Sequence, residues 1–401
     1  MFSTSESTYS LPPPISCLDA ITCNENVHGF LFASAAIVRE GGKKNAVHVL
    51  TFSEETNALT APHLPLALPG STEAVSMSCL EEMSNGSKDP DVGMILRDAE
   101  GYEAGIYTLT GVGKSLEEVE DDLEDDTRGR SVSNSSASSQ ISSADPPAAT
   151  LATLWSVEKS EVPLHTCAVH ASNHSTLLVS STQGLQAYDI GSRSSTWSTP
   201  KILSENYDVT SLSSDPHDSN LITCTVGTSL MTFDMRQEKA AHVIEGVDAY
   251  LATCGDYNPN RPHMFVSGGE DGLAKIWDFR SSSSSPSPPL LTLRSHTHHL
   301  TSVRYNRFHD QLLSTCGSDG STLLWRVGTV SSSPLLELNS DEDDETSKSS
   351  ADKLVQSVEG ESGCMGVAWS KCDAWVYVSV EWDGGVVVNH VPSEEKYKIL
   401  L

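Results

Sequence analysis

Short apolar runs, joined in pairs by tight turns, recur along the second half of the chain. The run at 264–280 is typical of a strand, a turn at Asp271-Gly272 and a second strand that ends on an aromatic residue. The runs at 311–325 and 375–389 repeat this plan around further Asp-Gly turns. Weaker copies lie at 177–190 and 221–236. The pattern therefore predicts pairs of antiparallel strands rather than helices.

The repeat also has a period that indicates a fold. An Asp follows the last aromatic residue of the unit at Asp189, Asp234 and Asp278, which are 45 and 44 residues apart. This is the spacing of WD40 repeats, in which about 40–45 residues form one four-stranded blade of a β-propeller. We therefore predict an all-β fold, a single seven-bladed WD40 β-propeller.

The blades can be placed along the chain from the same pattern. Strands of a first blade are expected at 30–33 and 47–52, and strands of a second at 75–79, 94–96 and 105–109. Blades three to seven are expected at 155–190, 209–236, 250–280, 300–327 and 365–391. A strand near 16–22 is predicted to close the ring by joining the last blade, which would leave no free sheet edge.

Two segments lack the apolar content of a blade. An acidic run at 117–126 and a Ser-rich stretch lie within 110–150, and a second acidic run lies within 331–360. High charge with few apolar residues predicts disordered inserts. The predicted organisation is a flexible N-terminus (1–14), divergent blades 1 and 2 (15–109), an insert (110–150), blades 3 to 6 (151–330), an acidic insert (331–360), and blade 7 with the C-terminal tail (361–401).

Each clear repeat carries a hydroxyl residue four positions before the turn Asp, and in the fifth and sixth blades a Trp follows six positions after that Asp. In WD40 repeats an upstream His links this Asp to the hydroxyl, which in turn bonds the Trp indole. Such a chain pairs buried polar groups that would each cost about 1–3 kcal/mol if left unpaired. The complete set is His296, Thr315, Asp319 and Trp325 in the sixth blade; the partial sets are Ser267, Asp271 and Trp277 in the fifth, with Val247 in place of the His, and Ser379 and Asp383 in the seventh, with Asn389 in place of the Trp.

Charge and cysteine usage limit the classes of partner and site. The formal net charge is −29, so the surface should repel nucleic acid and anionic membranes. No apolar run approaches the roughly 18–20 residues of a membrane helix, and no basic segment precedes an apolar core as in a secretory signal. The nine cysteines form no CxxC pair, which favours reduced thiols in a cytoplasmic protein over disulfides or zinc.

Motifs for enzyme chemistry are weak. Gly113-Lys114-Ser115 resembles part of a phosphate-binding loop, but the Gly that the motif needs is replaced by Thr108. His296, His298 and His299 are close in sequence, but no Cys or carboxylate at ligand spacing accompanies them. We therefore predict a protein that is not an enzyme and that uses no cofactor or metal.

Two further motifs point to regulation by other proteins. Trp277-Asp278-Phe279-Arg280 fits the WDxR box that docks substrate receptors to cullin-type ubiquitin ligases, with Asp278 and Arg280 as candidate docking residues. Ser340 directly precedes the second acidic run, and Ser131 and Ser133 each follow an Arg by three positions. These three serines are candidate phosphorylation sites, because acid-directed and basic-directed kinases select such contexts and each phosphate adds about −1.5 to −2 charge.

Beyond the generic repeat, the second half of the chain resembles one family. The segments 265–280 and 303–313 and the tail 383–401 are similar to the WD-repeat proteins that interact with the EARP and GARP vesicle-tethering complexes. The resemblance implies a non-catalytic adaptor that binds subunits of these complexes and promotes endosomal recycling and retrograde traffic. It also implies a peripheral location on endosomes and the trans-Golgi network, and a monomer within a larger assembly. A ubiquitin-ligase substrate receptor and a chromatin-type propeller remain as alternatives.

Overall fold

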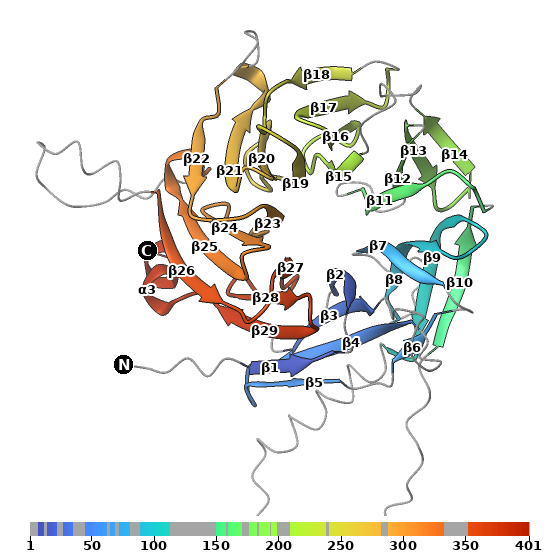
Figure 1. Cartoon of the computed structure of the whole chain (residues 1–401), viewed down its shortest axis with the longest axis horizontal. Coiled ribbons are helices and arrows are strands. Elements are labelled where there is room, and N and C mark those ends of the chain that lie inside the picture. Colours follow the sequence, from blue (N-terminus) through green and yellow to red (C-terminus); the bar gives the residue numbers. More distant parts are fainter. Residues whose placement is uncertain are drawn as a thin grey trace, which may run out of the picture.

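The chain forms seven antiparallel sheets arranged as blades around a central axis (Figure 1). This all-β, seven-bladed β-propeller confirms the fold predicted from the repeat. The computed structural model describes residues 7–11, 14–21, 27–34, 45–61, 65–68, 72–80, 89–112, 150–157, 159–170, 176–182, 184–192, 194–198, 209–237, 240–281, 288–332 and 352–400.

The first three blades follow one another along the chain, and each runs from an innermost to an outermost strand. Blade 1 contains β2 (Ile15–Ile21), β3 (Val27–Ser34), β4 (Ala46–Ser53) and β5 (Ala58–Thr60), with the short β6 (Leu66–Ala67) also paired to β4. Blade 2 contains β7 (Glu73–Cys79), β8 (Asp91–Arg97), β9 (Tyr102–Thr110) and β10 (Thr150–Ser156). Blade 3 contains β11 (Leu164–Val169), β12 (Thr176–Ser181), β13 (Gly184–Asp189) and β14 (Ser194–Ser198).

The remaining four blades repeat the arrangement. Blade 4 contains β15 (Val209–Ser214), β16 (Leu221–Val226), β17 (Ser229–Asp234) and β18 (Ala240–Ile244). Blade 5 contains β19 (Ala252–Tyr257), β20 (Met264–Gly269), β21 (Leu273–Asp278) and β22 (Leu291–Arg294). Blade 6 contains β23 (Leu300–Tyr305), β24 (Leu312–Gly317), β25 (Ser321–Val327) and β26 (Asp352–Glu359). Blade 7 contains β27 (Cys364–Trp369), β28 (Val376–Glu381), β29 (Gly385–His390) and β1 (Ser7–Ser10), and the short helices are η1 (Phe279–Ser281), η2 (Gly328–Val330) and α3 (Ser393–Leu400).

Burial falls from the middle of a blade to its outer edge. Every residue of β3, β4 and β24 is buried, because adjacent blades pack against both faces of these strands. The outer strand β26 has no buried residue.

Strand pairing shows that two predicted boundaries are wrong. Thr150–Ser156 is the outer strand of blade 2 and not the start of blade 3, and Asp352–Glu359 is a strand of blade 6 and not part of an insert.

Ring closure also differs from the prediction. The strand expected near 16–22 is β2, the innermost strand of blade 1. The closing strand is β1, which pairs antiparallel with β29 and places Ser7 opposite Val388. The predicted flexible N-terminus is thus partly a strand, and the Leu11 N–H that follows it donates to the Gly384 carbonyl at 2.8 Å. Pairing satisfies the edge of β29, which would otherwise be open to another chain.

The tight turns between the second and third strands explain the recurring Asp-Gly pairs. Gly272, Gly320 and Gly384 have φ values of 72°, 80° and 91°. This left-handed conformation is strained for residues with a Cβ, so glycine is required at these corners.

The segment after β29 is fixed to the propeller by a buried ion pair. In the third, fourth and fifth blades an Asp ends the third strand, but Arg326 stands near that position in blade 6. Its guanidinium lies 3.1 Å from the carboxylate of Glu395 in α3, and both side chains are almost fully buried. Lys353 on β26 and Lys398 on α3 also contact this carboxylate, at 2.6 and 3.3 Å. The ion pair between Arg326 and Glu395 therefore holds α3 against blade 6.

Two further observations concern membrane and thiol chemistry. In the part of the chain that the structure describes, no helix has the length and apolarity to cross a membrane. The eight cysteines within that part are free thiols, and burial raises the pKa of Cys167 to about 12. The Cys167 thiol therefore stays protonated and acts as a small apolar core residue.

Candidate functional site

The sixth blade brings together the four residues expected to form a hydrogen-bonded chain. The His296 Nε2 atom lies 2.8 Å from Thr315 Oγ1, and the Trp325 indole N–H donates to the same hydroxyl at 3.0 Å. On its other side, His296 Nδ1 lies 3.2 Å from the Asp319 carboxylate. That carboxylate also accepts the backbone N–H of Thr297 at 2.9 Å. The chain joins the strands of blade 6 to the loop that enters it from blade 5.

Burial and hydrogen bonding shift both titrating groups of this chain. Burial lowers the pKa of His296 from its ordinary 6.5, and the bond to Asp319 only partly opposes this. Burial alone would raise the pKa of Asp319, but the bonds from Ser321, Thr297 and His296 outweigh it and hold the pKa below 3.8. The neutral imidazole and the charged carboxylate are therefore the stable pair at neutral pH.

These shifts predict that acid destabilises the propeller. Because the unfolded His296 takes up a proton more readily, its contribution to stability is complete above pH 6.5 and falls as the pH decreases below that value. The contribution of Asp319 is present above pH 3.8 and is lost at still lower pH. Denaturant titrations at pH 7.5, 6.5 and 5.5 should therefore give a falling free energy of unfolding. In His296→Gln this fall should be smaller, and an identical pH profile would contradict the assignment.

Blades 5 and 7 replace the missing members of the chain in different ways. In blade 5 the Trp277 indole N–H donates to Ser267 Oγ at 2.9 Å, and the Lys275 ammonium lies 2.5 Å from the Asp271 carboxylate. Lys275 also donates to the Val247 carbonyl at 2.7 Å, so it pairs the turn Asp in place of the absent His and ties it to the backbone at 247 rather than to Ser267. Its spacing of four residues from Asp271 is a signal that sequence reasoning missed.

In blade 7, an amide takes the place of the indole. The Asn389 Nδ2 atom donates to Ser379 Oγ at 3.0 Å. Asp383 accepts the Gly385 N–H at 3.1 Å in the adjacent turn. The position of Asn389 was evident from the repeat, but its role as a donor follows only from the geometry.

The remaining residues that the sequence predicted as sites do not belong to these hydrogen-bonded series. Arg280 forms a two-point pair with Asp278, at 3.1 and 2.9 Å, and its side chain is 56% exposed. Asp234 and Arg236 form the same kind of pair in blade 4. His299 bonds the Ser318 hydroxyl at 3.0 Å. Residues 113–115 and the predicted phosphorylation sites Ser131, Ser133 and Ser340 lie outside the described residues.

The innermost strands of all seven blades line a cavity of about 510 Å³ at the centre of the ring. In successive blades one Thr of this strand reaches the next blade: Thr210 donates to the Ala252 carbonyl at 2.5 Å, and Thr253 donates to the Leu300 carbonyl at 2.6 Å. Thr301 continues the series to the Cys364 carbonyl at 2.8 Å. A register shift surrounds each Thr, so a β-bulge directs it sideways. These three bonds therefore link the innermost strands from blade 4 to blade 7 around the central cavity, which we call the channel.

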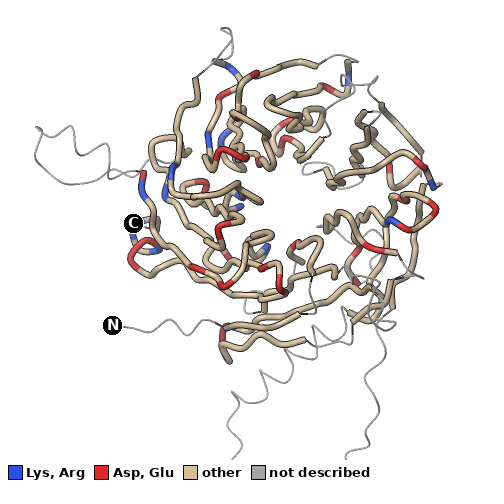
Figure 2. Tube along the Cα trace, viewed as in Figure 1, with Lys and Arg blue, Asp and Glu red and all other residues tan. Residues whose placement is uncertain are grey.

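The channel wall carries a cluster of basic residues, although the chain as a whole has a charge of −29. We call Arg304, Arg307 and Lys371 the basic cluster; they come from β23, the turn after it and the turn after β27. Acidic residues are spread around the ring, and basic residues also occur next to the central opening (Figure 2).

The acids of the channel wall are engaged by backbone donors. Asp19 accepts the Cys79 N–H at 2.6 Å, and Asp256 accepts the Tyr305 N–H at 2.9 Å. Burial also raises the pKa of Asp256, although the nearby Arg304 opposes this shift. The basic cluster lines the channel together with these two hydrogen-bonded acids, and Lys371 itself donates to the Cys79 carbonyl at 3.2 Å. Phe308, which directly follows Arg307 in the sequence, is exposed.

The fold and this channel define a WD40-type β-propeller, a class that uses its loop-lined ends to bind other proteins. Residues 172–325 match the family model described as EIPR1 beta-propeller. Our expectation from the sequence is thereby confirmed for residues 172–325, which match the EIPR1 β-propeller family. Propellers of this family are generally non-catalytic.

Several similar proteins have names that state what those proteins interact with. The chain is 33% identical over 195 residues to EARP and GARP complex-interacting protein 1 of Rattus norvegicus, covering 46% of this chain and 50% of that protein. It is 34% identical over 189 residues to EARP-interacting protein 1 of Caenorhabditis elegans, with 46% and 51% covered. A WD repeat-containing protein of Arabidopsis thaliana, DWA2, is 29% identical over 178 residues, with 44% and 48% covered. The chain spans about half the length of the curated relatives it matches.

Proposed function

We propose that this propeller is a non-catalytic adaptor that binds the EARP and GARP tethering complexes. The observation that carries the proposal is the similarity to proteins named for interaction with these complexes, at about one third identity. In this role it promotes endosomal recycling and retrograde traffic, and it reaches endosomes and the trans-Golgi network through its partners. It acts as one copy within the larger assembly.

We further propose that the basic cluster and Phe308 form the contact surface. The family match at 172–325 contains Arg304, Arg307 and Phe308, so all of this surface except Lys371 lies in the matched region. Cations next to an exposed aromatic ring suit an acidic partner segment that also carries apolar side chains. The acidic remainder of the propeller would repel the same segment elsewhere and so favour docking at the channel.

Affinity capture with mass spectrometry tests this proposal. The full chain should retain EARP and GARP subunits, and the double variant Arg304→Ala/Arg307→Ala should retain at least about tenfold less at low salt, with a smaller difference from the wild type at high salt because salt screens the contact. Arg294→Ala is the matched control, because Arg294 is an exposed Arg at the end of the outer strand β22.

Each other result counts against a defined part of the proposal. Equal capture by the wild type and the double variant would show that another surface makes the contact. Capture of a cullin adaptor or of histones in place of tether subunits by the wild type would overturn the adaptor role itself. If the wild type captured a cullin adaptor, Asp278 and Arg280 would become the residues to change next.

A further inference from the structure

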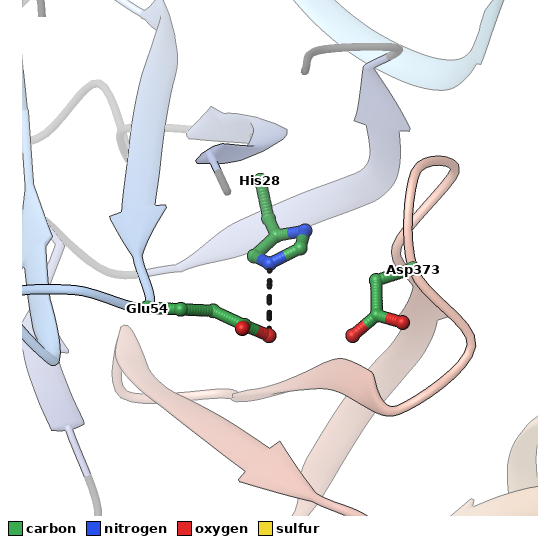
Figure 3. Close-up of side chains that lie close together, drawn as sticks. All are labelled: His28, Glu54 and Asp373. Carbon is green, nitrogen blue, oxygen red and sulfur yellow. Dashed lines mark ion pairs between the residues drawn. The ribbon is translucent and has the colours of Figure 1, made fainter. Parts of the chain in front are cut away.

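A cluster of ligand-type side chains lies where blade 1 meets blade 7. Three residues form it: His28 near the start of β3, Glu54 directly after β4, and Asp373 in the turn between β27 and β28 (Figure 3). One donor atom from each side chain lies within 4.8 Å of the other two. We call this group the seam cluster. None of its three residues lines the channel or belongs to the hydrogen-bonded series described in blades 5 to 7.

The imidazole of His28 is hydrogen-bonded through Nδ1 and faces the Glu54 carboxylate through Nε2. The ring is fully buried, it stacks on Phe52 with centroids 6.0 Å apart, and its Nδ1 atom lies 2.9 Å from Ser370 Oγ in blade 7. Its buried Nε2 atom has no hydrogen-bond partner. The nearest carboxylate oxygen, from Glu54, is 3.4 Å away, and Figure 3 shows Nε2 directed towards Glu54 with Asp373 beside it.

The same position in neighbouring blades is occupied differently. The turn residue after the first strand donates to the next blade: Asn258 Nδ2 to Asp310 at 3.0 Å, and Asn306 Nδ2 to the Ala374 carbonyl at 2.6 Å. Ser370 holds the equivalent place in blade 7 and meets His28. Blades 7 and 1 are therefore also joined by a hydrogen bond, here through His28 Nδ1, and the Nε2 atom of the same ring takes no part in that bond.

We propose that His28 Nε2 and the carboxylates of Glu54 and Asp373 bind a divalent first-row transition-metal ion, for which Zn²⁺ is the test case. One neutral imidazole with two carboxylates is a donor set that suits Zn²⁺ or Mn²⁺ better than Ca²⁺ or Mg²⁺, which prefer oxygen ligands alone. A bond from Nδ1–H to Ser370 Oγ would orient the ring and leave the Nε2 lone pair for the ion.

The present distances require only a local adjustment. Ligand bonds to Zn²⁺ are about 2.0–2.2 Å, so donor atoms on one ion lie roughly 3–3.5 Å apart. The Glu54 side chain is 42% exposed and can turn towards the site without disturbing the core. The ion would draw together two like-charged carboxylates and join ligands from blades 1 and 7. We therefore infer a structural ion that reinforces ring closure.

Calorimetric titration of the full chain with Zn²⁺ tests the proposal, together with its thermal unfolding midpoint in Zn²⁺ and in Mg²⁺. The wild type should bind one Zn²⁺ at a tight site and unfold at a higher temperature in Zn²⁺ than in Mg²⁺. Glu54→Gln and Asp373→Asn should each weaken this site at least about tenfold and lose the thermal shift. Glu55→Gln is the matched control, since it removes the charge of an exposed neighbouring acid.

The variants also separate the seam cluster from the acidic runs at 117–126 and 341–345, which offer oxygen ligands elsewhere in the chain. Both substitutions replace partly exposed side chains by amides of the same size, and circular dichroism would verify that the variants fold. Absence of a tight Zn²⁺ site in the wild type would overturn the proposal. So would unchanged affinity in both Glu54→Gln and Asp373→Asn.

Discussion

Replacing Glu395 by alanine should lower the free energy of unfolding by about 3–5 kcal/mol. Its carboxylate is the buried partner of Arg326, at 3.1 Å, and both side chains are at most 4% exposed. Alanine would remove this carboxylate from a buried guanidinium, and breaking a buried pair by removing one partner costs more than the value of the ion pair itself. Urea denaturation followed by tryptophan fluorescence measures the loss.

Glu394 provides a matched control for Glu395. It is the preceding residue, it is exposed in the first turn of the same helix, and Glu394→Ala should change stability little. A double variant Arg326→Leu/Glu395→Ala should recover part of the lost stability, because it removes the buried charge that has lost the Glu395 carboxylate. Equal effects of the Glu394 and Glu395 single variants would show that the buried pair does not hold α3 to blade 6.

The second large effect is expected at Asp319. Asp319→Ala should cost about 1–3 kcal/mol, because it unpairs His296 and the Thr297 N–H, which are bonded at 3.2 and 2.9 Å. The Ser321 hydroxyl, which donates to the same carboxylate at 2.6 Å, also loses its acceptor. The cost should therefore lie towards the upper end of that range. Thermal and urea unfolding of the full chain give the measurement.

Asp383→Ala should have a much smaller effect than Asp319→Ala. Asp383 is exposed, its bond is to the Gly385 N–H, and the Ser379 hydroxyl of its blade is already paired with Asn389. The two aspartates occupy the same position of the repeat, so the comparison isolates the hydrogen-bonded chain from the turn. If both variants lost the same stability, the turn rather than the chain would explain the cost.

The sequence identifies the middle strands of the blades well and the outer strands poorly, for a physical reason. Strands such as β24 are packed on both faces and must be apolar throughout, which leaves a clear pattern. Outer strands such as β26 face solvent and can be polar. The strand β1, with the sequence Ser-Thr-Tyr-Ser, carries no apolar alternation, and its pairing with β29 depends on the closed ring.

The candidate sites show the same division. The chain from His296 to Trp325 follows a local spacing within one repeat, so the sequence is sufficient to propose it. The seam cluster joins His28 to Asp373, and the basic cluster joins two blades around the channel. The residues of these groups are far apart in the sequence and meet only in the folded propeller, so no short sequence spacing predicts them.

The pairing of β1 with β29 has a consequence for biosynthesis. Residues 7–10 are made long before their partner strand at 385–390, because most of the propeller lies between the two strands in the sequence. At about 5–20 residues per second, the early strand waits on the order of tens of seconds for its partner. During that time the nascent chain carries an unpaired strand that other chains can capture. Exposure to misassembly is therefore set by the rate of translation rather than by the folding rate of any single blade.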